Sequence, residues 1–388
     1  MKKKNKLISW VALTLSIVML LSSFCFGANA EETNYPELAL SCKSAVLMEA
    51  STGEILYASN ENEPLPPASV TKVMTLLLVM EAIEAKKISY TDMVSASENA
   101  CSMGGSQIYL EPGEQMSVED LLKSVVIASA NDAALTLAEY VAGTEEVFVE
   151  MMNKKAAELG MENTNFENTN GLDDTTENHV TSAKDIAIMS RELIKYPKIT
   201  EYSSIWMDSV RNGEFGLTNT NRLVRFYKGA TGLKTGSTSK AGFCVSATAE
   251  RDGMTLIAVI MGSPSRDERN ASAVALLNYG FSNYTVFSNT EKQTAQIPIV
   301  KGKDNVCNAE ETEFFAVINK KYMGTVEKTI ELENSLTAPV KIGQQVGTVT
   351  YSINGKVIGS TQMLASETVE TVNFLDIFLR IIAKFSYC

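Results

Sequence analysis

The strongest constraint on the fold of this 388-residue chain is an apolar stretch from Ala68 to Ala85. Pro64 to Pro67 form a rigid entry to this stretch, and from Val73 to Val79 apolar residues cover nearly every side of the helix that the pattern predicts. A helix that is apolar all round is buried, whereas a surface helix keeps one polar face. We therefore expect residues 68–85 to form a central helix with a domain folded around it.

A second helical pattern begins at Ser117, which is followed by acidic residues in the first turn, a typical helix start. The pattern reaches Ala128, is interrupted by the polar residues of segment 129–132, and resumes from Ala133 to Val141. The interruption predicts polar side chains at a junction between two apolar helices. A further helix is expected from Asp185 to Ile194.

Strand patterns lie on both sides of this helical region. Residues 44–58 form two short apolar runs around a Ser-Thr-Gly turn, which predicts a hairpin. Between Ala230 and Met261 three further runs predict an antiparallel meander, and a helix from Ala271 to Gly280 is expected to pack on it. Helices packed on an antiparallel sheet predict an α+β domain.

The chain is long enough for more than one core, and its character changes beyond about Ser288. Short alternating apolar runs follow at residues 314–318, 325–332 and 346–353, and Asn354-Gly355 has the composition of a tight hairpin turn. These runs predict a small, separate β domain over residues 288–372.

The N-terminal segment predicts export. Four lysines precede an uncharged apolar stretch from Leu7 to Gly27, and Ala28-Asn29-Ala30 then stands directly before two glutamates. This order is typical of a secretory signal peptide over residues 1–30, although the stretch is long enough to be an uncleaved anchor. The formal net charge of −12 becomes −16 once the four lysines are removed, so nucleic acid is not an expected partner.

The last segment, residues 373–388, has an amphipathic helical pattern. Asp376, Arg380 and Lys384 share one face, and apolar residues, among them Phe374 and Phe378, cover the other. The segment is too short to span a bilayer, so we expect it to lie in the membrane surface. The alternative is a terminal helix docked on the β domain.

The cysteines and the histidine limit the kinds of metal site and catalytic triad that the chain can form. Beyond the first 30 residues the chain has five scattered cysteines with no CxxC pair, so no disulfide framework or zinc site can be derived. The one histidine, His179, excludes an HExxH zinc hydrolase, and any Ser/His/Asp triad would have to use it.

Three short motifs suggest an enzyme when they are taken together. SxxK and SxN each occur more than once, so a single match proves little, but KTG occurs only at Lys234-Thr235-Gly236, on a predicted strand. Requiring an SxxK that opens the buried helix and an SxN at the helix junction leaves one ordered combination. Its members are Ser69 with Lys72, Ser129 with Asn131, and the KTG strand.

The spacing gives each residue a chemical task. Residues three apart on a helix share a face, so the Lys72 amine can reach the Ser69 hydroxyl. A lysine acts as a base only when it is neutral, and both burial and a second cation such as Lys234 lower the pKa of Lys72. Without function, Ser69 would be an ordinary helix cap and Lys72 a solvated side chain, but a lysine within so apolar a helix is unusual.

The other motif residues complete a peptide site. Ser129 can pass a proton to a leaving amine and Asn131 can hold the substrate backbone, although loop capping is the commoner use of both types. Lys234 and Thr235 can bind a carboxylate, and Gly236 lacks a side chain that would block an extended peptide. The N–H groups of Ser69 and Ser237 are the expected oxyanion hole.

With these motifs the sequence resembles the low-molecular-mass penicillin-binding proteins that are serine-type D-Ala-D-Ala carboxypeptidases. The resemblance spans about residues 35–388 and includes segments 67–72, 104–106, 168–172 and 232–236. It implies a β-lactamase/transpeptidase-like domain over residues 31–287, an acyl-enzyme on Ser69 and no cofactor or metal. It also implies peptidoglycan pentapeptides as substrate and β-lactam antibiotics as inhibitors. By the same resemblance an arginine holds the terminal carboxylate; Arg269 fits by spacing, and Arg266 is the alternative.

Two other functions compete with this one. A class A β-lactamase shares the three motifs, but it needs a glutamate in an ExxLN pattern, and none follows Ser129. A catalytically idle cell-wall binding protein would not require all the motif residues. We therefore expect an exported carboxypeptidase at the outer face of the membrane.

Overall fold

The computed structural model describes residues 35–174 and 176–386, so the expected signal peptide lies outside the described residues. Five strands form one antiparallel sheet in the order β2-β1-β9-β8-β7. These strands are β1 (Ser44–Glu49), β2 (Ile55–Ser59), β7 (Ala230–Thr238), β8 (Gly242–Arg251) and β9 (Met254–Ser263). The expected N-terminal hairpin and the expected meander are thus confirmed, and pairing of β1 with β9 joins them into a single sheet.

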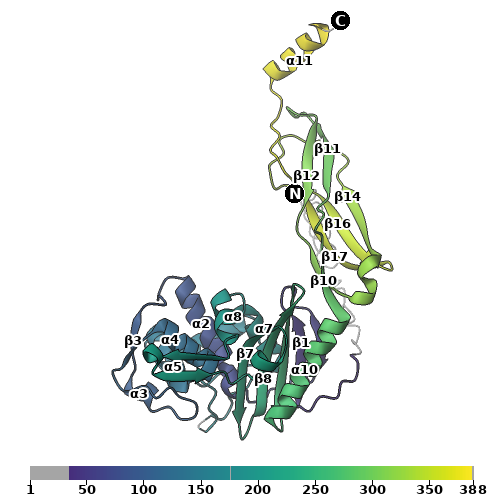
Figure 1. Ribbon diagram of the computed structural model, residues 1–388. Helices are drawn as coiled ribbons and strands as arrows, with labels where there is room; N and C mark the ends of the chain where they lie inside the picture. The colour runs from purple at the N-terminus through teal and green to yellow at the C-terminus, as the bar shows by residue number, and fades with distance from the viewer. Residues whose placement is uncertain (1–34, 175, 387–388) are drawn as a thin grey trace, which may run out of the picture. The chain divides into compact units, whose positions relative to one another are not determined.

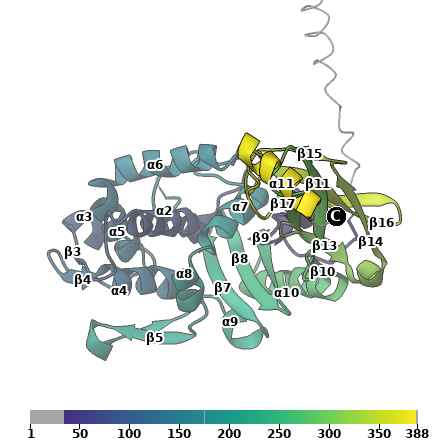
Figure 2. The same ribbon diagram turned by 90° about the horizontal axis from the view of Figure 1, so that it is seen from above.

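Helices cover both faces of this sheet. Helix α10 (Arg266–Asn283) lies on one face and α7 (Ala183–Leu193) on the other (Figures 1 and 2). Helix α10 begins five residues before the expected Ala271, because its first turns are polar and carry no apolar pattern. Its start is instead marked by Ser265, whose hydroxyl accepts a hydrogen bond from the Glu268 N–H.

The apolar stretch of residues 68–85 lies at the centre of a helical region. Its first turn is a 3-10 helix, η1 (Ala68–Thr71), and α2 (Lys72–Glu84) follows directly. Every residue from Lys72 to Met80 is buried. The prediction of a buried core helix is confirmed, with a tighter first turn than expected.

Helix α2 packs against α7 and against two of the remaining helices, α5 and α6. Helix α4 (Val118–Lys123) is capped by Ser117, as expected, and passes into a π-helical turn, η2 (Ser124–Ala128). Helix α5 begins at Asn131 rather than at Ala133, so the interruption is shorter than expected. The other elements are β3 (Met93–Ser95), α3 (Glu98–Cys101), β4 (Gln115–Ser117), α5 (Asn131–Ala142), α6 (Glu145–Glu158), α8 (Pro197–Ser203), β5 (Met207–Val210), η3 (Arg211–Gly213), β6 (Phe215–Thr218) and α9 (Leu223–Phe226).

The C-terminal part of the chain is β-rich, and its strands form a second core. The six-stranded sheet has the order β14-β16-β17-β12-β11-β15, and β10 pairs with β13. The expected hairpin turn at Asn354-Gly355 joins β16 to β17, with positive φ at both residues. The elements are β10 (Tyr284–Ser288), β11 (Thr294–Val300), β12 (Val306–Glu311), β13 (Phe315–Asn319), η4 (Lys320–Thr325), β14 (Val326–Leu332), β15 (Leu336–Thr337), β16 (Gln345–Ile353) and β17 (Lys356–Ala365). The α+β fold class is confirmed, and the domain boundary at residue 288 stays a prediction.

The chain ends in helix α11 (Phe374–Ser386). Asn373 and Asp376 cap its start by exchanging hydrogen bonds between side chain and backbone. The apolar side chains Phe374, Phe378 and Ile381 are exposed. Among the described residues, no helix is long and apolar enough to cross a membrane.

Candidate active site

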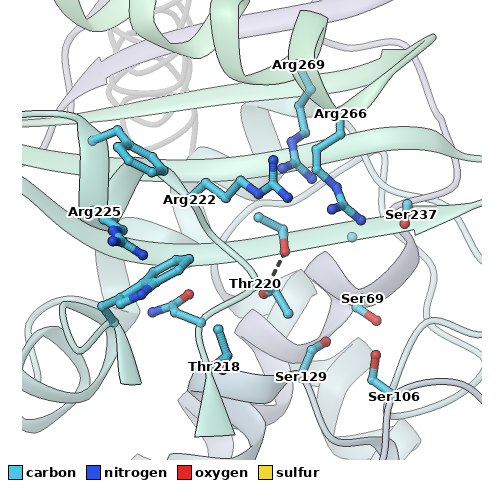
Figure 3. A pocket seen from close by; sticks show the side chains of 15 residues that line it. Ser69, Ser106, Ser129, Thr218, Thr220, Arg222, Arg225, Ser237, Arg266 and Arg269 are labelled. Atoms are coloured by element: carbon cyan, nitrogen blue, oxygen red, sulfur yellow. Dashed lines mark hydrogen bonds between the residues drawn. The ribbon is translucent and has the colours of Figure 1, made fainter. Parts of the chain in front are cut away.

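A pocket of about 550 Å³ opens where the edge strand β7 meets η1 and the junction before α5 (Figure 3). Six of the nine residues that the sequence predicted for the site line this pocket, namely Ser69, Ser129, Thr235, Gly236, Ser237 and Arg269. The other three, Lys72, Asn131 and Lys234, are buried beside them. The three motifs therefore meet in one place, although more than 160 residues separate the first from the last.

The first pair in the site is Ser69 and Lys72. The Lys72 amine lies 2.9 Å from Ser69 Oγ and donates a 2.8 Å hydrogen bond to the Asn170 carbonyl. Complete burial lowers the pKa of Lys72 well below its usual value, the charge on Lys234 lowers it further, and Asp132 acts in the opposite direction. A neutral Lys72 can accept the Ser69 proton across the contact that the structure already makes.

The loop that holds the Lys72 amine fits closely against η1. A Cβ on Gly171 would lie 1.9 Å from the Ala68 carbonyl oxygen, so only glycine leaves room here. Gly171 also has φ +84°, a conformation that glycine adopts without strain. The segment around Asn170 and Gly171 therefore positions the carbonyl that fixes the Lys72 side chain.

The second pair is Ser129 and Lys234. Ser129 ends the π-helical turn with φ 63°, in the left-handed region, and its hydroxyl accepts a 2.8 Å hydrogen bond from the Lys234 amine. Lys234 also donates to the Thr235 carbonyl at 2.9 Å. Burial lowers the pKa of Lys234 to about 7, and the nearby Arg269 charge contributes. The Lys234 amine therefore changes charge near neutral pH, and the Ser129 hydroxyl can pass a proton between this amine and a group bound in the pocket.

The side-chain amide and the backbone N–H of Asn131 are hydrogen-bonded, whereas its side-chain oxygen has no partner among the described residues. Its side-chain amide donates to the Gly104 carbonyl at 2.6 Å, and its backbone N–H donates to the Ser106 carbonyl at 2.7 Å. Its Oδ1 is buried and has no hydrogen-bond partner among the described residues. A buried acceptor without a partner costs free energy, so an N–H group of a bound ligand would stabilise it.

Strand β7 forms the opposite wall of the pocket. Thr235 Oγ1 donates to Thr220 Oγ1 at 2.8 Å, which aligns two hydroxyls (Figure 3). A Cβ on Gly236 would lie 2.7 Å from Ser69 N and 2.8 Å from the Pro67 carbonyl oxygen. Glycine is therefore needed here for a reason besides access of the peptide, because the missing side chain makes room for the backbone of η1 itself.

Both candidate arginines line the pocket. Arg269 is buried at its wall, bonded to the Cys244 carbonyl and the Asn270 side chain, whereas Arg266 is exposed. Burial, with the charges of Arg266 and Arg222, lowers the pKa of Arg269 to about 10. Sequence reasoning missed Thr220, Arg222 and Arg225, which also line the pocket and belong to no motif. Ser106, in the Gly-Gly-Ser segment 104–106, lines the pocket as well.

The single histidine does not contact Ser69. His179 Nε2 lies 2.8 Å from Thr71 Oγ1, and its Nδ1 accepts the Glu167 N–H at 2.9 Å. Burial lowers the pKa of His179 to about 4, so the ring is neutral. With both ring nitrogens engaged elsewhere, a Ser/His/Asp triad is excluded. The part of the chain that the structure describes also contains no cluster of metal-ligand type.

Comparisons with known proteins agree with this geometry. Residues 29–265 match the family described as D-alanyl-D-alanine carboxypeptidase, peptidase S11, and residues 281–371 match the C-terminal domain of penicillin-binding protein 5. The chain is 42% identical to D-alanyl-D-alanine carboxypeptidase DacF of Bacillus subtilis, over 95% of this chain and 96% of that protein.

Solved structures extend the likeness to the fold. Penicillin-binding protein 5 from Haemophilus influenzae superposes with a TM-score of 0.76 at 33% identity, covering 86% of this chain and 99% of that one. Penicillin-binding protein D2 from Listeria monocytogenes, in its ampicillin-bound form, has a TM-score of 0.59 at 32% identity and covers 63% of this chain and 100% of that one. The resemblance that the motifs indicated is confirmed: the chain belongs to the D-alanyl-D-alanine carboxypeptidase family, peptidase S11.

Proposed function

We propose that this protein is a serine-type D-Ala-D-Ala carboxypeptidase that removes the terminal D-alanine from peptidoglycan stem pentapeptides. The observation that carries the proposal is the 2.9 Å contact between the Ser69 hydroxyl and a fully buried Lys72 amine. Lys72 takes the proton as Ser69 Oγ attacks the carbonyl between the two D-alanines, and the N–H groups of Ser69 and Ser237 stabilise the oxyanion.

Ser129 and Lys234 serve the second half of acylation. The C–N bond breaks, the proton that Lys72 took from Ser69 passes through the Ser129 hydroxyl to the leaving amine, and an ester on Ser69 remains beside a neutral Lys72. Water then attacks that ester and gives a proton to Lys72, the bond from the acyl carbon to Ser69 Oγ breaks, and Ser69 Oγ recovers the proton as the shortened peptide is released. No cofactor or metal enters this cycle.

Binding residues hold the substrate in an extended form along β7. The free Oδ1 of Asn131 accepts a substrate N–H, and the Thr235 hydroxyl with Lys234 and Arg269 binds the terminal carboxylate. Gly236 keeps β7 close to Ser69, so the scissile carbonyl is placed against the nucleophile.

The test combines product release with covalent labelling. The mature protein should release D-alanine from a D-Ala-D-Ala pentapeptide, and penicillin should add one adduct mass that peptide mapping assigns to Ser69. Ser69→Ala should lose both signals. Ser237→Ala, which removes a hydroxyl from the same pocket, should retain the adduct and serves as the control. Labelling that persists in Ser69→Ala would refute the assigned nucleophile.

The competing function, a class A-like β-lactamase, lacks support in the pocket. That class uses a glutamate to activate water against the acyl-enzyme, and no Asp or Glu lines this pocket among the described residues. A penicillin ester on Ser69 should therefore be long-lived. Rapid penicillin turnover without release of D-alanine would favour the lactamase.

We also propose that the protein is exported and held at the outer face of the cytoplasmic membrane. Residues 1–30 carry the signal-peptide pattern, and the apolar side chains of α11 are exposed where the sequence places a membrane-binding face. The exported chain then consists of the peptidase domain (residues 31–287), the β domain (residues 288–372) and the surface-binding helix (residues 373–388).

A further inference from the structure

The pocket continues past the expected carboxylate site into a region lined by arginines. Arg222 and Arg266 converge near Arg269, and Arg225 lies farther out, on the side of Thr220 away from Ser69 (Figure 3). Arg222 and Arg225 are both contributed by the short helix α9 and the residue that precedes it. We call Arg222, Arg225 and Arg266 the outer arginines.

The outer arginines have no acidic partner in the structure. Among the described residues none of them forms an ion pair with an aspartate or glutamate, and no acidic residue lines the pocket. All three side chains are exposed, in a chain whose formal net charge is −12. Positive charge is therefore concentrated at one place on an acidic protein, which favours an anionic ligand there.

Arg225 is held in place although it has no charged partner. Its guanidinium lies 5.4 Å from the Trp206 ring centroid and 5.5 Å from that of Phe226, and both aromatic residues line the same pocket. Stacking on aromatic rings restricts a guanidinium without using its N–H donors. Those donors stay available for a carboxylate, which a guanidinium binds with two parallel hydrogen bonds.

One terminal carboxylate does not need this many cations. D-Alanine has a single carboxylate and an uncharged methyl side chain, and Thr235, Lys234 and Arg269 already supply a hydroxyl and two cations for it. Arg222 and Arg266 add two further cations beside Arg269, and Arg225 lies beyond them on the side of Thr220 away from Ser69. A larger leaving residue would extend its side chain toward these arginines.

We propose that the outer arginines form a subsite for a second carboxylate on the leaving group, so that the enzyme also hydrolyses D-Ala–X bonds in which X is an acidic D-amino acid. The inference rests on the proposed function and deepens it. Ser69 forms the same ester, the C–N bond to X breaks, the amine of X leaves with a proton, and water hydrolyses the ester.

The experiment compares three synthetic substrates with the same acyl part. They end in D-Ala-D-Ala, D-Ala-D-Glu and D-Ala-D-Gln, and the last two differ in charge but hardly in size. The readout is the ratio of kcat/KM for the D-Glu substrate to that for the D-Gln substrate. Because the ratio is taken within each protein, partial unfolding or a general loss of activity cancels.

The wild-type enzyme should prefer the D-Glu substrate to the D-Gln substrate by at least about fivefold in kcat/KM, the effect of a charged contact in a partly open site. This ratio should fall toward one in Arg225→Gln and in the double variant Arg222→Gln/Arg225→Gln. Lys228→Gln removes an exposed positive charge that lies near α9 but outside the pocket, and it should keep the wild-type ratio.

Two kinds of failure can be told apart. If the wild-type enzyme cleaves D-Ala-D-Ala but the D-Glu to D-Gln ratio is one, the second subsite is wrong and the carboxypeptidase stands. If no substrate is cleaved at all, the proposed function itself fails. A ratio that falls equally in Lys228→Gln and Arg225→Gln would show that general charge attraction, rather than a subsite, causes the preference.

Discussion

At the scale of single residues, the site depends on two lysines that are almost completely buried. Lys72 is 0% exposed and Lys234 is 1% exposed, and each contacts one serine hydroxyl. Burial disfavours the charged amine, and two amines in one site disfavour each other's protonation. The pocket therefore holds a neutral amine beside Ser69 at a pH where an exposed lysine would be charged.

This coupling predicts a shift in the pH profile of Lys234→Gln. The charge on Lys234 lowers the pKa of Lys72, so its removal raises that pKa, and the acidic limb of the acylation rate moves to higher pH. The rate itself should also fall, by about 100-fold, because a positioned electrostatic group is lost. The measurement is the rate of labelling by fluorescent penicillin across pH. The control Thr235→Val should slow labelling but leave the acidic limb of the pH profile at the same pH. If the acidic limb of Lys234→Gln also stays at the wild-type pH, the charge on Lys234 does not control the pKa of Lys72.

His179 predicts a pH dependence of stability rather than of activity. Its pKa is about 4 in the folded protein, and an unperturbed histidine has a pKa of about 6.5. The unfolded chain therefore binds more protons between these values, so stability is full above about pH 6.5 and falls as the pH drops toward 4. From about pH 7 to about pH 5 this loss amounts to about 2 kcal/mol.

The variant His179→Gln should show a smaller fall in unfolding free energy between those two pH values, measured in urea. It should also be less stable at neutral pH by about 1–3 kcal/mol, because buried hydrogen bonds are lost. Thr71→Val loses one of the same bonds but keeps the imidazole, so its pH dependence should match the wild type. If the stability of His179→Gln depends on pH as that of the wild type does, protonation of His179 is not the cause of the loss of stability at low pH.

Residue-level prediction from the sequence succeeded where contacts are local. Ser69 and Lys72 meet because three residues span one helical turn, which can be read from spacing alone. The contact between Lys234 and Ser129 needed the motif order, since 105 residues separate the two. Thr220 and the outer arginines could not be predicted, because tertiary packing brings them to the pocket and no periodic pattern marks them.

At the scale of elements, the approach of β7 to η1 depends on Gly236. In Gly236→Ala the new Cβ would lie within 3 Å of three backbone atoms, Ser69 N, the Pro67 carbonyl oxygen and Val70 N, and none of them can rotate away. The strand must move, which should destabilise the protein by about 1–3 kcal/mol. Displacing Ser69 from its partners by about 1 Å should slow acylation about 100-fold.

The control is Gly216→Ala, on strand β6, where a Cβ meets nothing within 4 Å. Both variants should be measured for penicillin acylation and for thermal unfolding. Acylation of Gly236→Ala at the wild-type rate would show that the close approach of β7 to η1 is not required.

Element boundaries were predicted well where apolar periodicity reaches the end of the element. The strands β8 and β9 and the turn between them followed from alternation and a Gly-containing turn. The start of α10 and the first turn of η1 were missed in detail, because polar first turns and 3-10 geometry leave the apolar pattern unchanged. Pairing of β1 with β9 is a contact across about 200 residues, which strand propensity does not specify.

At the scale of the whole molecule, the peptidase and β-rich parts have separate apolar cores, and helix α11 follows them. The core of the first part forms around α2, and that of the second includes Cys307, Tyr351 and Met363. Apolar side chains along α11 are 45–84% exposed in the described part of the chain, unlike those of either core. Such a helix buries its apolar face when it binds a lipid surface.

This arrangement predicts that protein beginning at Glu31 binds vesicles through α11. It should cosediment with vesicles that contain anionic phosphatidylglycerol, more than with neutral phosphatidylcholine, because the segment carries Arg380 and Lys384. Deletion of residues 373–388 should abolish binding, and Ile381→Glu should weaken it at least about tenfold by placing a charge on the apolar face. The control Val357→Glu puts the same charge on an exposed apolar residue of β17 and should bind like the wild type. Equal binding after the deletion would refute the role of α11, and the vesicle-binding surface would then lie within residues 31–372.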